Sequence, residues 1–357
     1  MGAEIKAGKL NIAADDLGSN ITILSRKDIS NIPVQTTAEL LGYIEGVDLR
    51  QRGPNGVQAD IQIQGGTFDQ VLVLIDGVRL TDPQTGHHML NLMVPPEAIE
   101  RIEIIKGATG LMTGSGDPSA TVNLIRKKPT KEFKASISGT VGSWDAYRTV
   151  GDISGSLTDT GNVRGRFVGA YSDQNSYLDH YSQRKDLFYG ILEADLSDDT
   201  LLTFGVDKSS TTPRGSSWTG NPVYFADGGR TDFGRHFNSA ADWSRRDFDN
   251  ITYFASLEQA LANDWKFKVS LDQKTTDHDT RRASASGGNP NRATGEGMFM
   301  YWGRWEGHRV QNTADVNVSG PFTLGGREHE LIAGVMTSHS RQTGSTYDTS
   351  AFSEVPG

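Results

Sequence analysis

Arginine and aromatic side chains gather in one long polar stretch of the chain, residues 209–247, which holds the strongest candidates for ligand chemistry. They include Arg214, Trp218, Tyr224, Phe225 and Trp243. Aromatic rings and guanidinium groups suit a chromophoric, negatively charged ligand, through stacking and charge-assisted hydrogen bonds. The same residues could instead pack the stretch itself or lie at a membrane interface, the interpretation favoured for Tyr301, Trp302 and Trp305, so both remain open.

Metal or bond-making chemistry is not indicated by the remaining candidates. His87 and His88 are adjacent in sequence, so they lack the i, i+4 spacing and the nearby carboxylate of a zinc enzyme. A solvated pair of loop histidines is the favoured interpretation. No G-x-S-x-G motif is present. We expect no catalytic residues and no metal ligands.

The glycine-rich stretch KGATGLMTGSGDPSATVNLIRKK, residues 106–128, resembles a phosphate-binding loop at first sight. Such a loop needs converging backbone N–H groups and usually a Lys and a Ser or Thr after its last glycine. Here Gly116 is followed by Asp117, which repels phosphate, and by Pro118, which lacks an N–H. The stretch therefore predicts tight turns that lead into a strand over residues 120–125.

Composition narrows the class of protein. The 357 residues include 41 glycines and no cysteine, and the formal net charge is -9. No apolar run approaches the roughly 18 residues of a membrane-spanning helix, and no basic stripe favours nucleic acid. The first residues lack the pattern of a signal peptide. These observations leave a membrane protein built from strands open.

The first third of the chain predicts a small α+β domain. Alternating or continuous apolar runs predict strands at 21–24, 60–64, 71–75 and 101–105, and Asp76-Gly77 predicts a tight turn after the third. Short helices are expected at 36–44, where Thr36 provides a cap, and at 95–99, which begins with two prolines.

After Pro129 the pattern changes to runs of about nine to twelve residues that alternate between apolar and polar side chains. These runs include 133–141, 163–172, 251–259, 265–272 and 310–318. Strands of about ten residues match a tilted strand that crosses a bilayer, although a soluble sheet with one wet face gives the same alternation. Tight connections at 142–147 and 196–200 contrast with long ones at 209–247 and 278–294, as in an outer-membrane barrel. We count about ten strands.

Several motifs in order give the chain a resemblance to TonB-dependent outer-membrane receptors. They are Ala38-Glu39-Leu40-Leu41, the segment 60–66, the segment 73–78, the block 96–107, and Gly114-Ser115-Gly116 leading to 122–125. The resemblance implies an N-terminal extension at 1–20, a plug domain at 21–128, and the N-terminal part of an antiparallel transmembrane β-barrel at 129–357. Since the family's barrel has about 22 strands, this barrel is expected to be incomplete.

Two branches of the family are represented in the plug. Residues 110–125 are similar to ferric-siderophore receptors of the pyoverdine type, whereas 52–106, with 82–88, resemble cobalamin-type or Bacteroidetes-type receptors. A composite origin of the two halves is therefore one interpretation. The TonB box, a short apolar segment before the plug, has only poor candidates at 4–7 and 10–13.

The resemblance implies transport of a ferric siderophore across the bacterial outer membrane, in contact with the lipid bilayer and driven by TonB, without enzyme activity, cofactor or nucleic acid. The iron would arrive wrapped by its chelator. Expected ligand contacts are Arg52, at the plug apex, with Arg214, Trp218, Tyr224, Phe225 and Trp243. The alternatives are a receptor for cobalamin or another nutrient, or a soluble β-rich binding or adhesion protein. In the soluble protein, Phe133, Ile137 and Val141 would pack on a second sheet.

Overall fold

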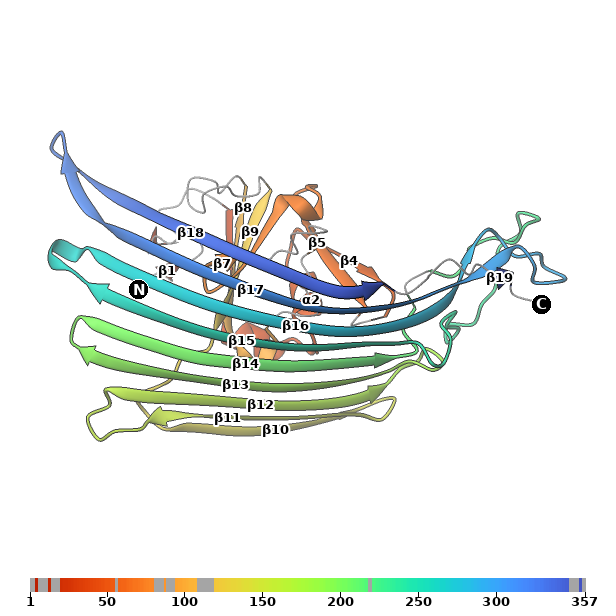
Figure 1. Cartoon of the computed structure of the whole chain (residues 1–357), viewed down its shortest axis with the longest axis horizontal. Coiled ribbons are helices and arrows are strands. Elements are labelled where there is room, and N and C mark those ends of the chain that lie inside the picture. The colour runs from red at the N-terminus through yellow and green to blue at the C-terminus, as the bar shows by residue number, and fades with distance from the viewer. Residues whose placement is uncertain are drawn as a thin grey trace.

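The computed structural model describes residues 4–5, 12–13, 20–54, 57–79, 87, 94–107, 119–217, 220–346 and 353–354. A small α+β unit, within residues 20–127, lies against one face of a large curved sheet that is formed within residues 134–354 (Figure 1). We call the small unit the plug and the large sheet the wall. Two short strands, β1 (Glu4–Ile5) and β2 (Ile12–Ala13), pair with each other before the plug.

Two capped helices begin the plug. In α2 (Thr37–Gly42), Thr36 Oγ1 accepts from Glu39 N at 3.1 Å, and the Glu39 carboxylate accepts from Thr36 N at 3.1 Å. This helix was predicted. The other helix, α1 (Arg26–Asn31), has the same capping box but was missed, because only Ile29 of its six residues is buried and the sequence RKDISN shows no apolar face. The expected helix at 95–99 is a single 3-10 turn, η4 (Pro96–Ala98), and a second turn, η2, spans Phe68–Gln70.

The plug sheet has the strand order β3-β8-β9-β6-β7, formed by Asn20–Leu24, Ile99–Lys106, Ala120–Arg126, Val71–Ile75 and Val78–Arg79. Strands β6 and β9 run parallel and every residue of both is buried. A separate hairpin joins β4 (Val47–Arg52) to β5 (Gln58–Ile63). Val73 and Ile104 are fully buried in the core that these elements share with α2. The predicted strands are therefore confirmed.

The wall is one antiparallel sheet in which each strand pairs with the next along the chain. Its strands are β10 (Lys134–Gly142), β11 (Ala146–Ser156), β12 (Val163–Asn175), β13 (Ser182–Ser197), β14 (Thr200–Arg214), β15 (Arg245–Ala260), β16 (Lys266–Gly287), β17 (Met298–Leu324), β18 (Arg327–Thr346) and the short β19 (Ser353–Glu354). Among the described residues β10 and β18 do not pair with each other, so the sheet is open. An antiparallel, incomplete barrel of about ten strands is confirmed.

Strand lengths depart from the prediction. The wall strands β10–β18 have 9 to 27 residues, and β16 and β17 alone have 22 and 27. The expected length of nine to twelve residues is therefore too short for β16 and β17. The apolar side chains of their outer face end before the backbone hydrogen bonding between the strands ends. Near Asp277 and Asp279 both faces are polar, so the alternation disappears although the pairing continues. The predicted boundary at 128–129 falls between β9 and β10 and stays a prediction.

The connections also differ from their predicted bounds. The long connection is 215–244 rather than 209–247, and the next is 288–297 rather than 278–294. The turn at 143–145 lies at the same end of the wall as these long loops. Trp144 and Asp145 have positive φ angles of 59° and 52°, which keep this turn tight. Turns at 198–199 and 325–326 close the opposite end (Figure 1).

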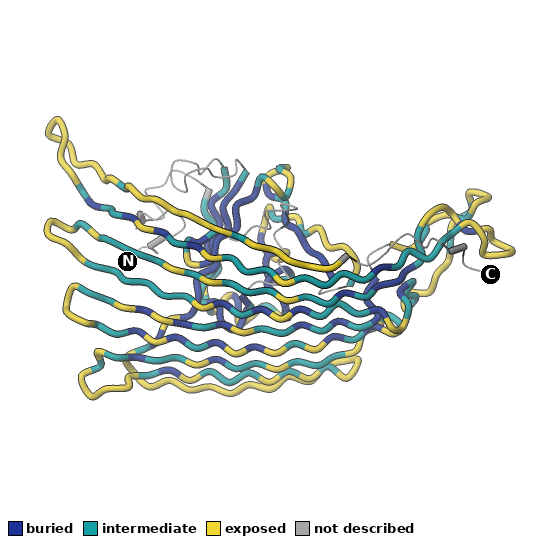
Figure 2. The backbone as a smooth tube through the Cα atoms, viewed as in Figure 1, coloured by how far each residue is buried: buried dark blue, intermediate teal, exposed yellow. Residues whose placement is uncertain are grey.

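The two faces of the wall differ in polarity. On β15 the alternate residues Phe248, Asn250 and Thr252 are buried toward the plug, while Tyr253 points to the other side with 45% exposed. Figure 2 shows this alternation of buried and exposed positions along the strands. Phe133, Ile137 and Val141 are 74%, 83% and 78% exposed, so the described sheet does not cover them as a soluble sandwich would. No described helix is long and apolar enough to span a bilayer.

Candidate functional site

Three loops join into one surface at the long-loop end of the wall. The side-chain amide of Asn238 donates to the carbonyl oxygens of Asp179 and Gly215, both at 2.8 Å. Asp179 N donates to His236 O at 2.8 Å, which ties loop 176–181 to loop 215–244. Ala226 N donates to Pro290 O at 2.9 Å, which adds loop 288–297. The long loop is thus held by backbone contacts to both neighbours.

Phe225, a predicted ligand contact, lies under a cation in this surface. The guanidinium carbon of Arg292 is 4.3 Å from the centre of the Phe225 ring, and Arg292 Nε donates to Asp227 Oδ2 at 3.0 Å. This hydrogen bond lowers the pKa of the Asp227 carboxyl below its usual value. The ring therefore helps to hold two loops together.

The other aromatic candidates of the long loop are more open. Tyr224 is 49% exposed and forms an isolated bridge with Arg230, and Trp243 is 55% exposed just before β15 begins. About half of each side chain is therefore exposed to solvent. Trp218 lies outside the described residues.

Arg52 lies where the plug approaches the long loop. It is exposed at the end of β4, and Gly53 follows it with a φ of +71°. A Cβ on Gly53 would lie 2.2 Å from the carbonyl oxygen of Ser217, so only glycine fits there. The structure therefore brings the plug apex and the base of loop 215–244 together, as a shared binding site requires.

Arg214 is separated from the other candidates. It pairs in register with Arg245 and forms an ion pair with Asp247. Side chains alternate along the paired strands, so all three residues lie on the same face as Tyr253, which is the face away from the plug. The structure does not place Arg214 beside Arg52.

Sequence reasoning missed an aromatic and cationic lining on the inner face of the wall. Tyr301 and Trp305 stack with ring centres 6.4 Å apart, and the guanidinium carbon of Arg282 is 5.8 Å from the Trp305 ring. Tyr301 and Trp305 pair with Ser284 and Thr280, which are buried on the plug side. The interpretation of Tyr301 and Trp305 as interface residues is therefore wrong. The alternation of inward and outward side chains, counted from the apolar part of β17 back to its loop end, would have placed Tyr301 and Trp305 on the inner face.

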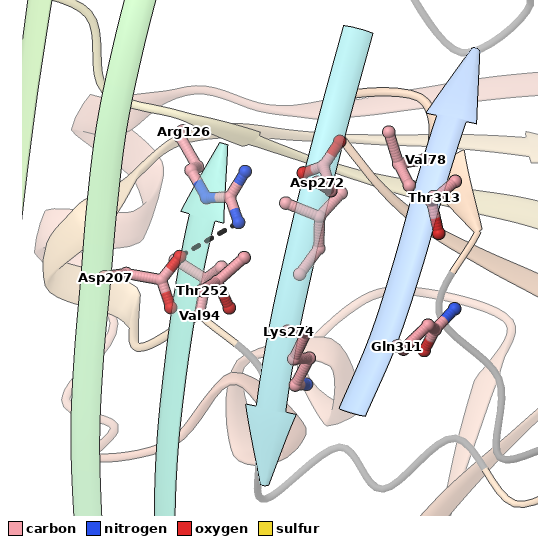
Figure 3. A pocket seen from close by; sticks show the side chains of 10 residues that line it. Val78, Val94, Arg126, Asp207, Thr252, Asp272, Lys274, Gln311 and Thr313 are labelled. Carbon is pink, nitrogen blue, oxygen red and sulfur yellow. Dashed lines mark hydrogen bonds and ion pairs between the residues drawn. The ribbon is translucent and has the colours of Figure 1, made fainter. Parts of the chain in front are cut away.

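A second missed group joins the plug to the wall. Arg126 is 5% exposed, and its guanidinium donates to Asp76 of the plug at 2.8 Å and to Asp207 of β14 at 2.9 Å. It also lies 4.3 Å from the Phe254 ring. Burial opposes the charge, but Asp207 and Asp76 outweigh it and raise the pKa of Arg126. Figure 3 shows Arg126 and Asp207 with Asp272 and Lys274, all of which line one cavity. Its volume is about 20 Å³.

Further polar contacts fasten the plug to β11–β13. Lys127 Nζ lies 2.7 Å from Asp152 Oδ2, and Arg166 binds the same carboxylate at 2.7 Å. Burial lowers the pKa of Lys127 despite this partner. Tyr189 donates to the carbonyl oxygen of Lys127 at 2.6 Å. These partners are far apart in sequence, so no local pattern reveals them, and they make the plug–wall contact a network of charge-assisted hydrogen bonds.

Metal ligands do not cluster in the described part of the chain: no group of three or more His, Asp or Glu side chains there could hold an ion. His87 stacks on Phe68 at 4.5 Å between ring centres, and its Nδ1 lies 2.9 Å from Asp60 Oδ2. The expectation of a solvated histidine is wrong for His87. His88 lies outside the described residues.

Comparison with known proteins agrees with this architecture. Residues 13–121 match the TonB-dependent receptor plug domain. The ferripyoverdine receptor of Pseudomonas aeruginosa is 36% identical over 342 residues, which cover 96% of this chain and 41% of that protein. Residues 13–121 therefore belong to the TonB-dependent receptor plug family, and plug and wall together resemble part of a ferripyoverdine receptor. The crystal structure of the P. aeruginosa outer-membrane ferripyoverdine receptor bound to ferripyoverdine superposes with a TM-score of 0.87 and 34% identity, over 96% of this chain and 45% of that one.

The relatives also provide evidence on the cellular location and on the resemblance of the plug to two branches of the family. They are outer-membrane receptors, so the predicted location in the bacterial outer membrane is confirmed. The vitamin B12 transporter BtuB of Vibrio cholerae is 30% identical over 151 residues, 42% of this chain and 24% of that protein. Since one pyoverdine-type relative matches both halves of the plug, a composite origin is not needed to explain the pattern. The chain spans less than half the length of these relatives.

Proposed function

We propose that this chain serves in TonB-dependent uptake of a ferric siderophore across the outer membrane. The observation that carries the proposal is the similarity to a ferripyoverdine receptor, which extends over plug and wall together at 36% identity. The iron chelate is the cargo and arrives already complexed. No residue of the described chain is assigned as an iron ligand.

The ligand would bind between the plug apex and the loop surface. Arg52, Tyr224 and Trp243 are exposed, and Gly53 brings the apex against Ser217 at the base of the loop that carries the two aromatic residues. Aromatic rings would stack on the chromophore and arginines would attract its negative charge. Phe225, covered by Arg292, would act by holding the loop, and Trp218 remains a proposed contact.

Release toward the cell interior requires the plug to shift against the wall. Support for a plug able to do so comes from the polar part of its attachment: Arg126 donates to Asp207 and Lys127 donates to Asp152, and water can replace both hydrogen bonds. We propose that TonB, as the partner of the family, supplies the pull.

The test is uptake of iron-55 by cells that lack their own siderophore receptors and express this receptor in full from its gene. With ferripyoverdine, cells containing TonB should accumulate iron, and cells without TonB should bind the complex at the surface but accumulate none. Accumulation that is the same without TonB would contradict the mechanism.

Cobalamin is a second candidate ligand, favoured by the 30% identity to a vitamin B12 transporter. The same cells would be offered cyanocobalamin and ferripyoverdine, and quenching of tryptophan fluorescence in the purified receptor would report binding. Binding of cyanocobalamin together with no response to any ferripyoverdine would reverse the choice of ligand.

A further inference from the structure

Apolar packing attaches the plug to one part of the wall, strands β12 and β13. Among the described residues, the buried wall side chains that join the apolar core of the plug come from these two strands: Val168, Leu187, Tyr189 and Ile191. Val168 and Tyr189 pair across the two strands and are fully buried. Separation of the plug from this part of the wall would expose these side chains to water, at a cost that grows with the apolar area exposed.

Polar side chains face the plug on the neighbouring strands β14–β17. The cavity of about 20 Å³ in Figure 3 lies between them and the plug. All of its lining residues from the wall are polar: Asp207 of β14, Thr252 of β15, Asp272 and Lys274 of β16, and Gln311 and Thr313 of β17. The plug contributes Ile75, Val78, Val94 and Arg126. Apolar plug side chains thus face polar wall groups across a space that holds about one water molecule, so little apolar burial attaches the plug here.

The ion pair of Arg126 and Asp207 closes the plug against this polar side. Arg126 donates to Asp207 at 2.9 Å and to Asp76 of the plug at 2.8 Å, so it keeps a partner when the plug moves away from β14. Separation allows water to reach both Arg126 and Asp207, and neither charge is then left buried and unpaired. The contact therefore opposes separation less than the apolar packing on β12 and β13 does.

The polar surface of β15–β17 continues on both sides of the cavity. Toward the loops, Thr276 donates to Asn250 at 2.8 Å, and toward the turns, Asn317 donates to Asp315 at 2.7 Å. Asn250, Asp315 and Asn317 are buried on the inner face. We call the inner face of β15–β17 from Asn250 to Asn317 the polar strip. It offers hydrogen-bond donors, acceptors and both signs of charge along the wall.

We infer that, among the strands of this chain, the plug separates first from β14–β17 while it stays packed on β12 and β13, and that the cargo passes along the polar strip. The inference rests on the proposed function and deepens it, by naming the side of the plug on which the chelate moves. A wrapped iron chelate presents oxygen and nitrogen atoms, with which Thr252, Lys274 and Gln311 can exchange hydrogen bonds in turn. These residues would contact the cargo in transit and not when it binds at the loops.

The experiment compares single cysteines on the two sides of the plug, Thr252→Cys and Val168→Cys, in the full receptor without other cysteines. Both residues are β-branched and face the plug, with 6% and 0% exposed. Cells take up ferripyoverdine in the presence of a small, charged methanethiosulfonate reagent that does not cross membranes. TonB should accelerate the reaction of Thr252→Cys at least about tenfold, which corresponds to about 1.4 kcal/mol, and leave Val168→Cys unchanged. Iron uptake by each variant shows that it is folded, and Thr313→Cys with Ile191→Cys is the replacement pair.

Three results would overturn the inference: equal acceleration at both cysteines, greater acceleration at Val168→Cys, or acceleration at neither while iron accumulates. A measurement without cargo separates this inference from the proposed function. In the purified receptor, Thr252→Cys should become reactive at a lower urea concentration than Val168→Cys, because less apolar burial must be lost. The reverse order would overturn the inference whatever the cargo. A wild-type receptor that neither binds nor accumulates ferripyoverdine would count against the proposed function, and the order in urea would still decide where the plug separates first.

Discussion

Val73 in the plug and Ile137 in the wall are branched apolar residues of β-strands, yet Val73 is fully buried and Ile137 is 83% exposed. The plug is built like a soluble domain, with apolar side chains on the inside. The wall reverses that order: its outer face is apolar and its inner face carries Asn250, Asp207 and Arg282. The two regions meet through the ion pairs of Arg126 and Lys127 and also through an apolar cluster, in which Val168, Leu187, Tyr189 and Ile191 of the wall join the plug core.

Truncation of the plug core should give the largest effect. Ile104 is fully buried, so Ile104→Ala should destabilise the plug by about 4 kcal/mol through lost burial and a cavity. Ile137→Ala is the matched control and should cost less than about 1 kcal/mol, because its side chain packs on little protein. Hydrogen exchange of β8 and β9 in increasing urea would measure both. Equal effects would contradict the contrast between the regions.

Loss of one plug–wall ion pair should come next. Asp207→Ala leaves the buried Arg126 with Asp76 alone, which should weaken docking of the plug by about 3 kcal/mol. The double variant Arg126→Leu/Asp207→Leu removes both charges and should recover part of the loss. Protease cleavage of the plug at increasing urea would report docking. If the plug docks less stably in the double variant than in Asp207→Ala, the lost ion pair is not the cause of the weaker docking.

A charge on the outer face should disturb the wall by a smaller amount. Leu271 is 53% exposed on the outer face, and Leu271→Arg should cost about 2 kcal/mol in a bilayer. Ser270→Arg, at the adjacent inward position, is the comparison. Heat-modifiable migration on gels would measure the folded fraction after insertion into vesicles. Tolerance of Leu271→Arg with no loss of folding would indicate that this position does not face lipid.

The loop contact of Arg292 should give the smallest effect. Because the hydrogen bond from Arg292 lowers the pKa of Asp227, the contact should be complete above the usual carboxyl pKa of 3.8 and be lost as the pH falls through the lower folded value. Slow hydrogen exchange of Ala226 N–H, which donates to Pro290, should persist at pH 5 and disappear in strong acid. Arg292→Gln should remove this pH dependence. Protection that is unchanged by the substitution would contradict the role of Arg292.

The sequence predicted the parts of the fold that depend on neighbouring residues. The capped helix at Thr36, the turn at Asp76-Gly77 and the buried strand Val71–Ile75 are all decided locally. The lengths of β16 and β17 were missed because a backbone ladder continues where side-chain alternation ends.

The site was only partly predictable for a related reason. The loop aromatics were visible as a cluster in sequence, and the structure places Arg52 beside the base of their loop. An arginine such as Arg214 has suitable chemistry for a ligand contact, but its position in β14 places its side chain on the face away from the plug. The contacts of Arg126 with Asp207 depend on register and on docking of the plug, which no local pattern encodes.

The most direct test of the account is the environment of each residue along β15. The chain has no cysteine, so single cysteines at positions 250–257 can be spin-labelled in the full receptor in bilayers. The account predicts alternation: high oxygen accessibility at odd positions such as Tyr253, which face lipid, and low accessibility at even positions such as Thr252, which face the plug. Uniform accessibility, or odd positions shielded from lipid as by a second sheet, would contradict it.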